Sequence, residues 1–161
     1  MNIFEFAKEK EKYAEDFYRD RAAKSPDKGL SKIFLLLANE EEKHFDMIDK
    51  MQSDKPAEFG ETDVLADAIT IFEKIREGGK KFTFDKSELE LYKEAQKIEE
   101  DSRKFYLEKA GEVTNQAYKD IFLRLADEEK KHYLLLDNII EFVARPERWL
   151  EDAEFYHLED Y

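Results

Sequence analysis

The sequence predicts an all-α protein: a four-helix bundle in which two similar antiparallel helix hairpins are joined by a long crossover containing a short helix. Three observations predict this fold. Glycine (5) and proline (3) are scarce among 161 residues, so few turns are forced. Four long segments repeat apolar residues at three- and four-residue steps. The two halves also align without a gap when the sequence is shifted by 88 positions, which places His44 on His132.

The first hairpin is predicted from its helical periodicity and its turn. Its first helix is expected over residues 3–23. Ser25 followed by Pro26 indicates the N-cap and first turn of the second helix, which is expected to run to about Ser53. A connection this short makes the two helices antiparallel neighbours.

The second hairpin is predicted to repeat the first. Its first helix is expected to begin at Asp85, where Glu88 completes a capping-box pair, and to end near Lys109 or Ala110. Its second helix is expected over residues 115–144, before a proline that cannot continue it.

The crossover between the hairpins spans residues 54–84. Residues 62–77 within it are expected to form the short helix, ended by Gly78 and Gly79. The bundle, residues 3–144, is expected to belong to a single domain.

That domain is expected to cover residues 1–161 and to include a C-terminal tail, residues 147–161, that is rich in aromatic and acidic residues. Because exposed aromatic rings are unfavourable in water, we expect Trp149, Phe155 and Tyr156 to dock on the bundle.

Charge and composition exclude several kinds of partner and site. A net charge of -13 disfavours binding to nucleic acid and to anionic lipid surfaces, while it attracts cations. The absence of cysteine excludes disulfides, thiol catalysis and iron–sulfur ligation within these residues. No apolar run approaches the length of a membrane span and no signal-peptide core is present, so a cytoplasmic protein that does not enter membranes is expected.

Six side chains at repeat-related positions predict a metal site. Glu41 and His44 lie three residues apart on one helix face, the repeat gives a second such pair, and each half adds one further carboxylate. The predicted ligands are Glu11, Glu41, His44, Glu99, Glu129 and His132. Bundle packing is expected to bring all six to the core, where polar groups left unpaired are prohibitive. Two divalent ions balance four carboxylates and two neutral imidazoles.

Carboxylate and imidazole ligands suit iron, manganese or zinc, so two iron ions are expected, with manganese or zinc as alternatives. Tyr18 and Tyr106 follow Glu11 and Glu99 by seven residues and share their helix faces. We expect these tyrosines either to pack in the core or, beside the ligands, to orient them or pass an electron.

Glu-x-x-His alone is a weak signal, because the chain has 40 aspartate and glutamate residues. Glu154 and His157 form a third copy in the tail, where no repeat partner exists, and are expected to be an exposed pair outside the site. Six other glutamates are expected to lie on solvated faces in ion pairs along their helices. They are Glu5, Glu9, Glu15, Glu40, Glu42 and Glu100.

With these motifs on paired helices, residues 3–144 resemble the ferritin-like di-iron carboxylate proteins, a class with this ligand arrangement. The spacing from Glu11 to Tyr18 and Ala22, followed by Ala38-Asn39-x-Glu41-x-x-His44, is most similar to the rubrerythrin branch. The resemblance implies that Glu41 and Glu129 bridge the metals. It also implies that the remaining carboxylates are terminal ligands and that each histidine holds one iron.

Two departures from that branch are visible. Rubrerythrins typically carry a cysteine-ligated rubredoxin domain, which a chain without cysteine cannot form. They also tend to have an extra glutamate three residues after Glu99, where this chain has Ser102. The predicted site is therefore nearer the symmetric arrangement of bacterioferritins, and any reductant is expected to be a separate electron-donor protein.

The resemblance implies an oxidoreductase in which Fe(II) is oxidised while peroxide or dioxygen is reduced. One alternative is a ferroxidase or iron-storage protein, which a hollow cage assembly would indicate. Another is a structural or partner-binding helix bundle without catalysis, which would fold and bind its partners unchanged after replacement of the six ligands. A homodimer is expected by analogy with the family.

Overall fold

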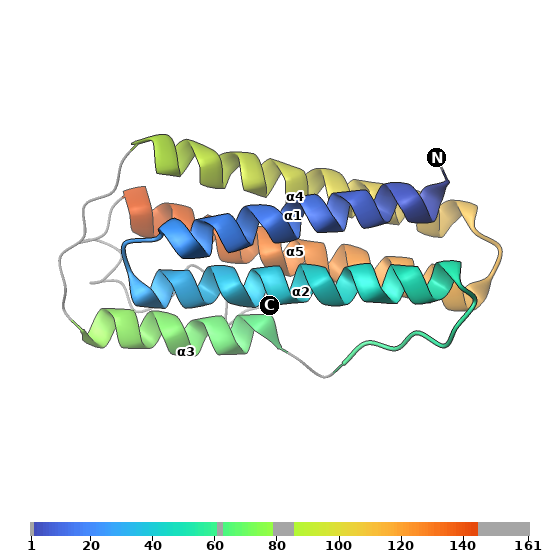
Figure 1. The fold of residues 1–161 in the computed structure, drawn as a ribbon, viewed down its shortest axis with the longest axis horizontal. Helices are drawn as coiled ribbons and strands as arrows, with labels where there is room; N and C mark the ends of the chain where they lie inside the picture. Colours follow the sequence, from blue (N-terminus) through green and yellow to red (C-terminus); the bar gives the residue numbers. More distant parts are fainter. Residues whose placement is uncertain (1, 61–62, 79–85, 145–161) are drawn as a thin grey trace. The chain divides into compact units, whose positions relative to one another are not determined.

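The structure is a computed structural model that describes residues 2–60, 63–78 and 86–144, and within these ranges it contains five helices and no strand (Figure 1). The helices are α1 (Ile3–Lys24), α2 (Lys28–Gln52), α3 (Val64–Glu77), α4 (Lys86–Glu112) and α5 (Gln116–Ala144). The all-α class and the order of hairpin, short helix and hairpin are confirmed.

Some predictions fall on residues that the structure does not describe. They concern the cap at Asp85, the second glycine after the short helix, and the whole tail. The tail residues in question are Trp149, Glu154, Phe155, Tyr156 and His157.

The chain divides into two compact units, Met1–Val64 and Leu65–Tyr161. The first contains the α1–α2 hairpin and the second contains the α4–α5 hairpin. The single domain expected over residues 1–161 stays a prediction.

Side-chain contacts show that α1 and α2 are antiparallel. Near one end of the hairpin, Lys8 Nζ donates to Asp49 Oδ1 at 3.1 Å and Gln52 Nε2 donates to Glu5 Oε1 at 2.7 Å. At the other end, the hydroxyl of Ser31 donates to the carbonyl of Ala22 at 2.7 Å. Contacts that join early α1 to late α2, and late α1 to early α2, require opposite helix directions.

The predicted N-cap of α2 is wrong by two residues. Asp27 caps the helix, because its carboxylate accepts from the backbone N–H of Leu30 at 2.9 Å. Ser25 is instead the C-cap of α1, and its hydroxyl donates to the carbonyl of Asp27 at 3.2 Å. The anionic Asp side chain, one residue after Pro26, supplies the acceptor that the helix start needs.

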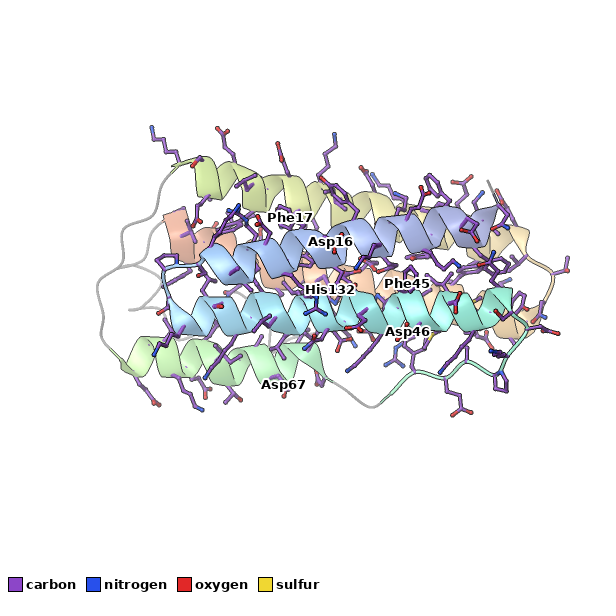
Figure 2. The ribbon with its side chains drawn as sticks, in the orientation of Figure 1. Asp16, Phe17, Phe45, Asp46, Asp67 and His132 are labelled. Carbon is purple, nitrogen blue, oxygen red and sulfur yellow. The ribbon has the colours of Figure 1, made fainter. Side chains whose placement is uncertain are left out.

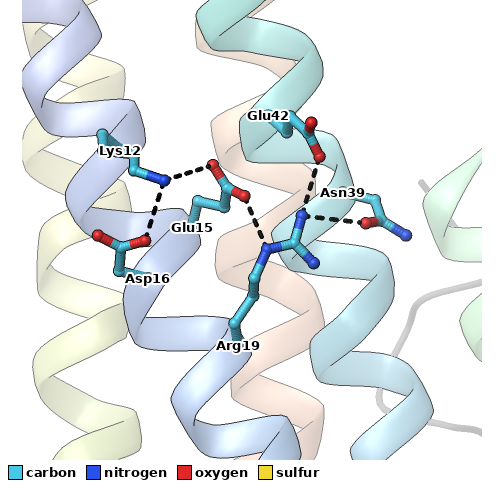
Figure 3. Close-up of polar contacts among 6 residues, drawn as sticks. All are labelled: Lys12, Glu15, Asp16, Arg19, Asn39 and Glu42. Carbon is cyan, nitrogen blue, oxygen red and sulfur yellow. Dashed lines mark hydrogen bonds and ion pairs between the residues drawn. The ribbon is translucent and has the colours of Figure 1, made fainter.

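An arginine joins the middle of α1 to α2 (Figure 3). Arg19 Nε donates to Glu15 Oε2 at 2.7 Å, and its terminal nitrogen donates to Glu42 Oε2 at 2.9 Å and Asn39 Oδ1 at 3.4 Å. Lys12 reaches the other oxygen of Glu15 at 3.6 Å. Because one guanidinium holds acceptors from both helices, this contact fixes their register.

The α4–α5 hairpin repeats this arrangement in the second unit. The Asn115 side chain accepts from the N–H of Tyr118 at 3.1 Å, as the repeat of the Asp27 cap predicts. Across the pair, Gln96 Nε2 donates to the carbonyl of Tyr133 at 3.3 Å and to Asp137 Oδ1 at 3.2 Å. These contacts again join early α4 to late α5.

The predicted end of α4 needs correction. The helix continues to Glu112, past the expected end at Ala110, and the N–H of Val113 still donates to the carbonyl of Lys109 at 3.1 Å. Gly111 therefore lies within the helix and does not end it. Glu88 accepts from the Tyr92 hydroxyl at 2.9 Å, a partner one turn later in the helix.

Matching aromatic pairs lie in the two hairpins. Tyr18 stacks on Phe34 with ring centroids 6.4 Å apart, and Tyr106 stacks on Phe122 at 6.1 Å, both with an interplanar angle of 19°. All four side chains are almost completely buried. The same geometry in both units shows that the sequence repeat is also a repeat of packing.

The short helix α3 is amphipathic. Val64, Leu65, Ala68, Phe72 and Ile75 are buried, and Asp67 lies on the exposed face (Figure 2). The helix ends as predicted, where the N–H of Gly78 donates to the carbonyl of Lys74 at 3.1 Å. None of the described helices is both long and apolar enough to cross a membrane.

Candidate metal centre

The first hairpin brings three of the predicted ligands together. Glu11 comes from α1, while Glu41 and His44 come from consecutive turns of α2. One ligand atom from each of the three lies within 4.8 Å of those of the other two. His44 Nδ1 is 3.5 Å from Glu11 Oε2 and 3.9 Å from Glu41 Oε2. We call these three residues the first half-site.

The second hairpin brings together the other three. Glu99 comes from α4, and Glu129 and His132 come from α5 (His132 is labelled in Figure 2). Their ligand atoms also lie within 4.8 Å of one another, and His132 Nδ1 is 3.6 Å from Glu99 Oε1. We call these three residues the second half-site. The His44–Glu11 distance in the first hairpin and the His132–Glu99 distance in the second differ by only 0.1 Å.

All six predicted ligands are strongly buried. None of the side chains in the two half-sites is more than 2% exposed. Carboxylates are seldom buried to this degree unless they are paired or coordinate a metal. These glutamates are more completely buried than Glu5, Glu9 and Glu42, which are exposed.

The spacing of the ligand atoms fits a metal ion better than direct hydrogen bonds. Contacts of 3.5–3.9 Å between imidazole nitrogen and carboxylate oxygen are too long for good hydrogen bonds. Two ligands on one ion at about 2.1 Å each, separated by an angle near 100°, lie roughly 3.2 Å apart. The histidine–carboxylate contacts across the two hairpins, at 3.5 Å and 3.6 Å, are close to this spacing.

Small residues flank the carboxylate on the first helix of each hairpin. Ala7 and Ala14 lie one turn before and after Glu11, and Ala95 and Ser102 hold the same positions around Glu99. All four are buried. These short side chains fill less volume beside the carboxylates than larger apolar residues would.

An aromatic ring from outside the hairpin shields the first half-site. Phe59, in the segment after α2, places its ring edge-on to the His44 imidazole, with centroids 6.4 Å apart. An apolar contact of this kind limits the access of water to the ligand, which matters for the chemistry of a bound metal.

The two tyrosines that share helix faces with the candidate ligands, Tyr18 and Tyr106, are part of the core. Tyr18 and Tyr106 stack on Phe34 and Phe122 and make edge contacts with the preceding phenylalanines, with centroids 5.5 Å and 5.4 Å apart. The packing role is confirmed. A role in orienting ligands or passing electrons stays a prediction.

Two of the glutamates assigned to solvated faces are buried instead. Glu15 and Glu40 are each only 8% exposed. Glu15 lies under Arg19, which neutralises it. Glu40 directly precedes a ligand, and its repeat partner Glu128, which the sequence reasoning overlooked, is 3% exposed. The repeat itself was the available signal, since it pairs Glu40 with Glu128 as it pairs the ligands.

Comparisons with known proteins identify the family of the chain. A search of the curated proteins found no match. A solved structure, that of a hypothetical protein from Pyrococcus furiosus, is similar with a TM-score of 0.64 and 25% identity, over 88% of this chain and 87% of that one. The family model described as rubrerythrin matches residues 2–140, which include both half-sites. The chain therefore belongs to the rubrerythrin family of ferritin-like proteins.

Proposed function

We propose that the two half-sites form one centre for two iron ions, and that the protein is an oxidoreductase that reduces peroxide or dioxygen. The observation that carries this proposal is the duplication of a buried Glu–Glu–His set with nearly equal spacing in both hairpins. Membership of the rubrerythrin family supports iron as the metal. Manganese and zinc accept the same ligands, so metal content has to be measured.

Charge balance supports the binding of two divalent ions, one at each half-site. Each half-site offers two carboxylates and one imidazole, so one divalent ion per half-site neutralises it. A pair of bound Fe(II) ions supplies two electrons, which is the number needed to convert one hydrogen peroxide and two protons into two waters. The electrons are restored by a separate donor, because these 161 residues contain no cysteine for a second iron centre of the rubredoxin kind.

The protein residues have distinct parts in this proposal. Glu41 and Glu129 would be shared between the two ions, Glu11 and Glu99 would each hold one ion, and so would His44 and His132. The Phe59 ring beside His44 limits the access of water to the first half-site. The stacked aromatic pairs hold the helices in register, so the ligands are positioned before the metal arrives.

The test is to load apo-protein with Fe(II) without oxygen and then follow oxidation of the iron by absorbance after adding peroxide or dioxygen. We expect about two irons per chain and faster oxidation by peroxide. Glu41→Ala should remove iron binding, while Asp46→Ala, an exposed acid on the same helix (Figure 2), should not.

Other results would change the assignment. Preferential oxidation by dioxygen inside a large hollow assembly would indicate a ferroxidase or storage protein. A folded protein that binds no metal would leave a helix bundle whose buried carboxylates have a structural role only.

A further inference from the structure

The chain turns sharply where helix α2 ends. Asp54 has a φ of 54°, a left-handed conformation that residues other than glycine seldom adopt and that aspartate tolerates better than most. The N–H of Asp54 donates to the carbonyl of Met51 at 3.1 Å. The N–H of Lys55 donates to the carbonyl of Lys50 at 2.8 Å. These two bonds form the Schellman motif, which ends a helix and redirects the chain.

After this turn, residues 55–60 run back in the direction of the start of α2 (Figure 1). The distance along α2 from His44 to Gln52 is roughly 12 Å. About five residues of extended chain cover up to about 16 Å, so the segment is long enough to return to the level of His44. The contact between the rings of Phe59 and His44, with centroids 6.4 Å apart, is therefore a consequence of the turn.

Phe59 lies between a candidate ligand and solvent. The His44 side chain is 1% exposed, and its Nδ1 is 3.5 Å from Glu11 Oε2. The ring of Phe59 meets the same imidazole edge-on, while Phe59 itself is partly exposed. One ring thus contacts both the buried ligand and water. Because this ring belongs to a segment outside the helices, it can move aside without the unfolding of α1 or α2.

We propose that Phe59 is a gate for metal ions at the first half-site, and that the turn at Asp54 holds this gate in place. The ring has to move aside before a divalent ion reaches or leaves His44. This inference rests on the proposed two-metal function and adds to it the route by which an ion enters. Phe59 is not a ligand in this scheme, so it sets the rates of metal exchange and leaves the affinity to the carboxylates and the imidazole.

The expected size of the effect follows from the strength of one aromatic contact. An edge-to-face ring pair favours the closed arrangement by a factor of about 2 to 10 in the equilibrium constant. Without the ring, the route is open for a correspondingly larger share of the time, and an ion uses it in both directions. Association and release should therefore accelerate by the same factor. The dissociation constant, which is the ratio of the two rates, should stay nearly the same.

The test uses Co(II) alone as the probe and follows its visible absorption on the full chain. Stopped-flow mixing gives the association rate, and mixing of the loaded protein with excess chelator gives the release rate. The kinetic phase that His44→Ala abolishes belongs to the first half-site. In that phase, Phe59→Ala should accelerate association and release about 2- to 10-fold, while calorimetry should give a nearly unchanged dissociation constant.

A matched control removes an aromatic ring from the neighbourhood of His44 without opening the gate. Phe45 follows His44 on α2, is partly exposed like Phe59, and has Lys8 Nζ 5.7 Å from the centre of its ring (Figure 2). Phe45→Ala should leave both rates as in the wild type. Circular dichroism verifies that each variant folds.

A second pair of variants tests the turn without touching the ring. A β-branched residue is strongly disfavoured at a positive φ, so Asp54→Val should displace the segment and accelerate Co(II) exchange as Phe59→Ala does. Asp54→Gly adopts the same φ without strain and should exchange Co(II) at the wild-type rate.

The outcomes separate this inference from the proposal beneath it. Unchanged rates in Phe59→Ala would overturn the gate, because ions would then reach His44 by another route. Faster release with unchanged association would also overturn it, since the ring would then stabilise the bound ion. Equal rates in the two Asp54 variants would show that the turn does not position the ring. No Co(II) bound by the folded wild type would instead overturn the proposed metal centre itself.

Discussion

Glu11→Gln should have opposite effects on the metal-free and metal-loaded protein. The substitution keeps the size of the side chain and removes one of the two buried carboxylates of the first half-site. An oxygen of Glu11 lies within 4.8 Å of an oxygen of Glu41. At an effective dielectric constant of about 20, two such charges repel by about 3.5 kcal/mol. The substitution removes this repulsion, but the amide also makes weaker contacts than the carboxylate did. The net effect should be a stabilisation of the apo-protein by about 1–3 kcal/mol.

The metal-loaded protein should lose stability relative to the wild type. An ion present at about 100 times its dissociation constant stabilises the folded state by about 2.7 kcal/mol per site. Without the Glu11 carboxylate, most of that gain at the first half-site disappears. For a chain of this length, each kcal/mol moves the melting temperature by about 2–4 °C, so both changes are measurable.

The assay is thermal unfolding followed by circular dichroism, with chelator and with saturating Fe(II) under anaerobic conditions. Glu9→Gln, which removes the same charge from an exposed position of the same helix, should alter both melting temperatures little. If Glu11→Gln instead destabilises the apo-protein and leaves the metal-dependent gain unchanged, Glu11 is a structural carboxylate and the reasoning is refuted.

Three further predictions concern the hairpins. Arg19→Met should destabilise the protein by about 1–3 kcal/mol in urea unfolding, because buried Glu15 loses its closest cation; an unchanged midpoint would show that the arginine contacts are dispensable. Phe122→Ala should cost about 3–5 kcal/mol through the cavity it leaves, and a loss below 1 kcal/mol would contradict the packing. A hydrogen bond from Gln52, aided by the charge of Lys8, lowers the pKa of Glu5. The ionised Glu5 carboxylate therefore contributes stability that is fully present above the ordinary pKa of glutamate and is lost as the pH falls through the lowered pKa. Gln52→Ala should return that pKa toward the ordinary value in an NMR titration, and no change would contradict the assigned cause.

The fold class and the clustering of the candidate ligands within each hairpin could be predicted because the repeat carries information that single motifs lack. Glu-x-x-His alone cannot separate Glu41 and His44 from the tail pair, since every glutamate-rich helix contains such spacings by chance. The shift by 88 positions selects residues that occur twice in the same helical phase. The structure then buries those residues and leaves Glu9 and Glu42 exposed.

Side-chain partners could not be predicted from periodicity in the same way. Glu15 and Glu40 lie on the edges of their helix faces, where burial depends on which cation covers them. The arginine over Glu15 reaches across to the second helix, and no pattern within one helix shows that contact. The cap of α2 was misplaced for a related reason: Ser25 and Asp27 both suit an N-cap, and the start of the helical hydrogen bonds decides between them.

The most direct test of the central claim is electron paramagnetic resonance of protein loaded with Mn(II). If the six ligands from both hairpins form one centre, two ions should bind per chain and give the spectrum of a magnetically coupled pair. Replacing a ligand in either half-site should convert that spectrum to the six-line signal of an isolated ion. Two ions that give only isolated signals in the wild type would contradict a shared centre, and no bound ion would contradict a metal site altogether.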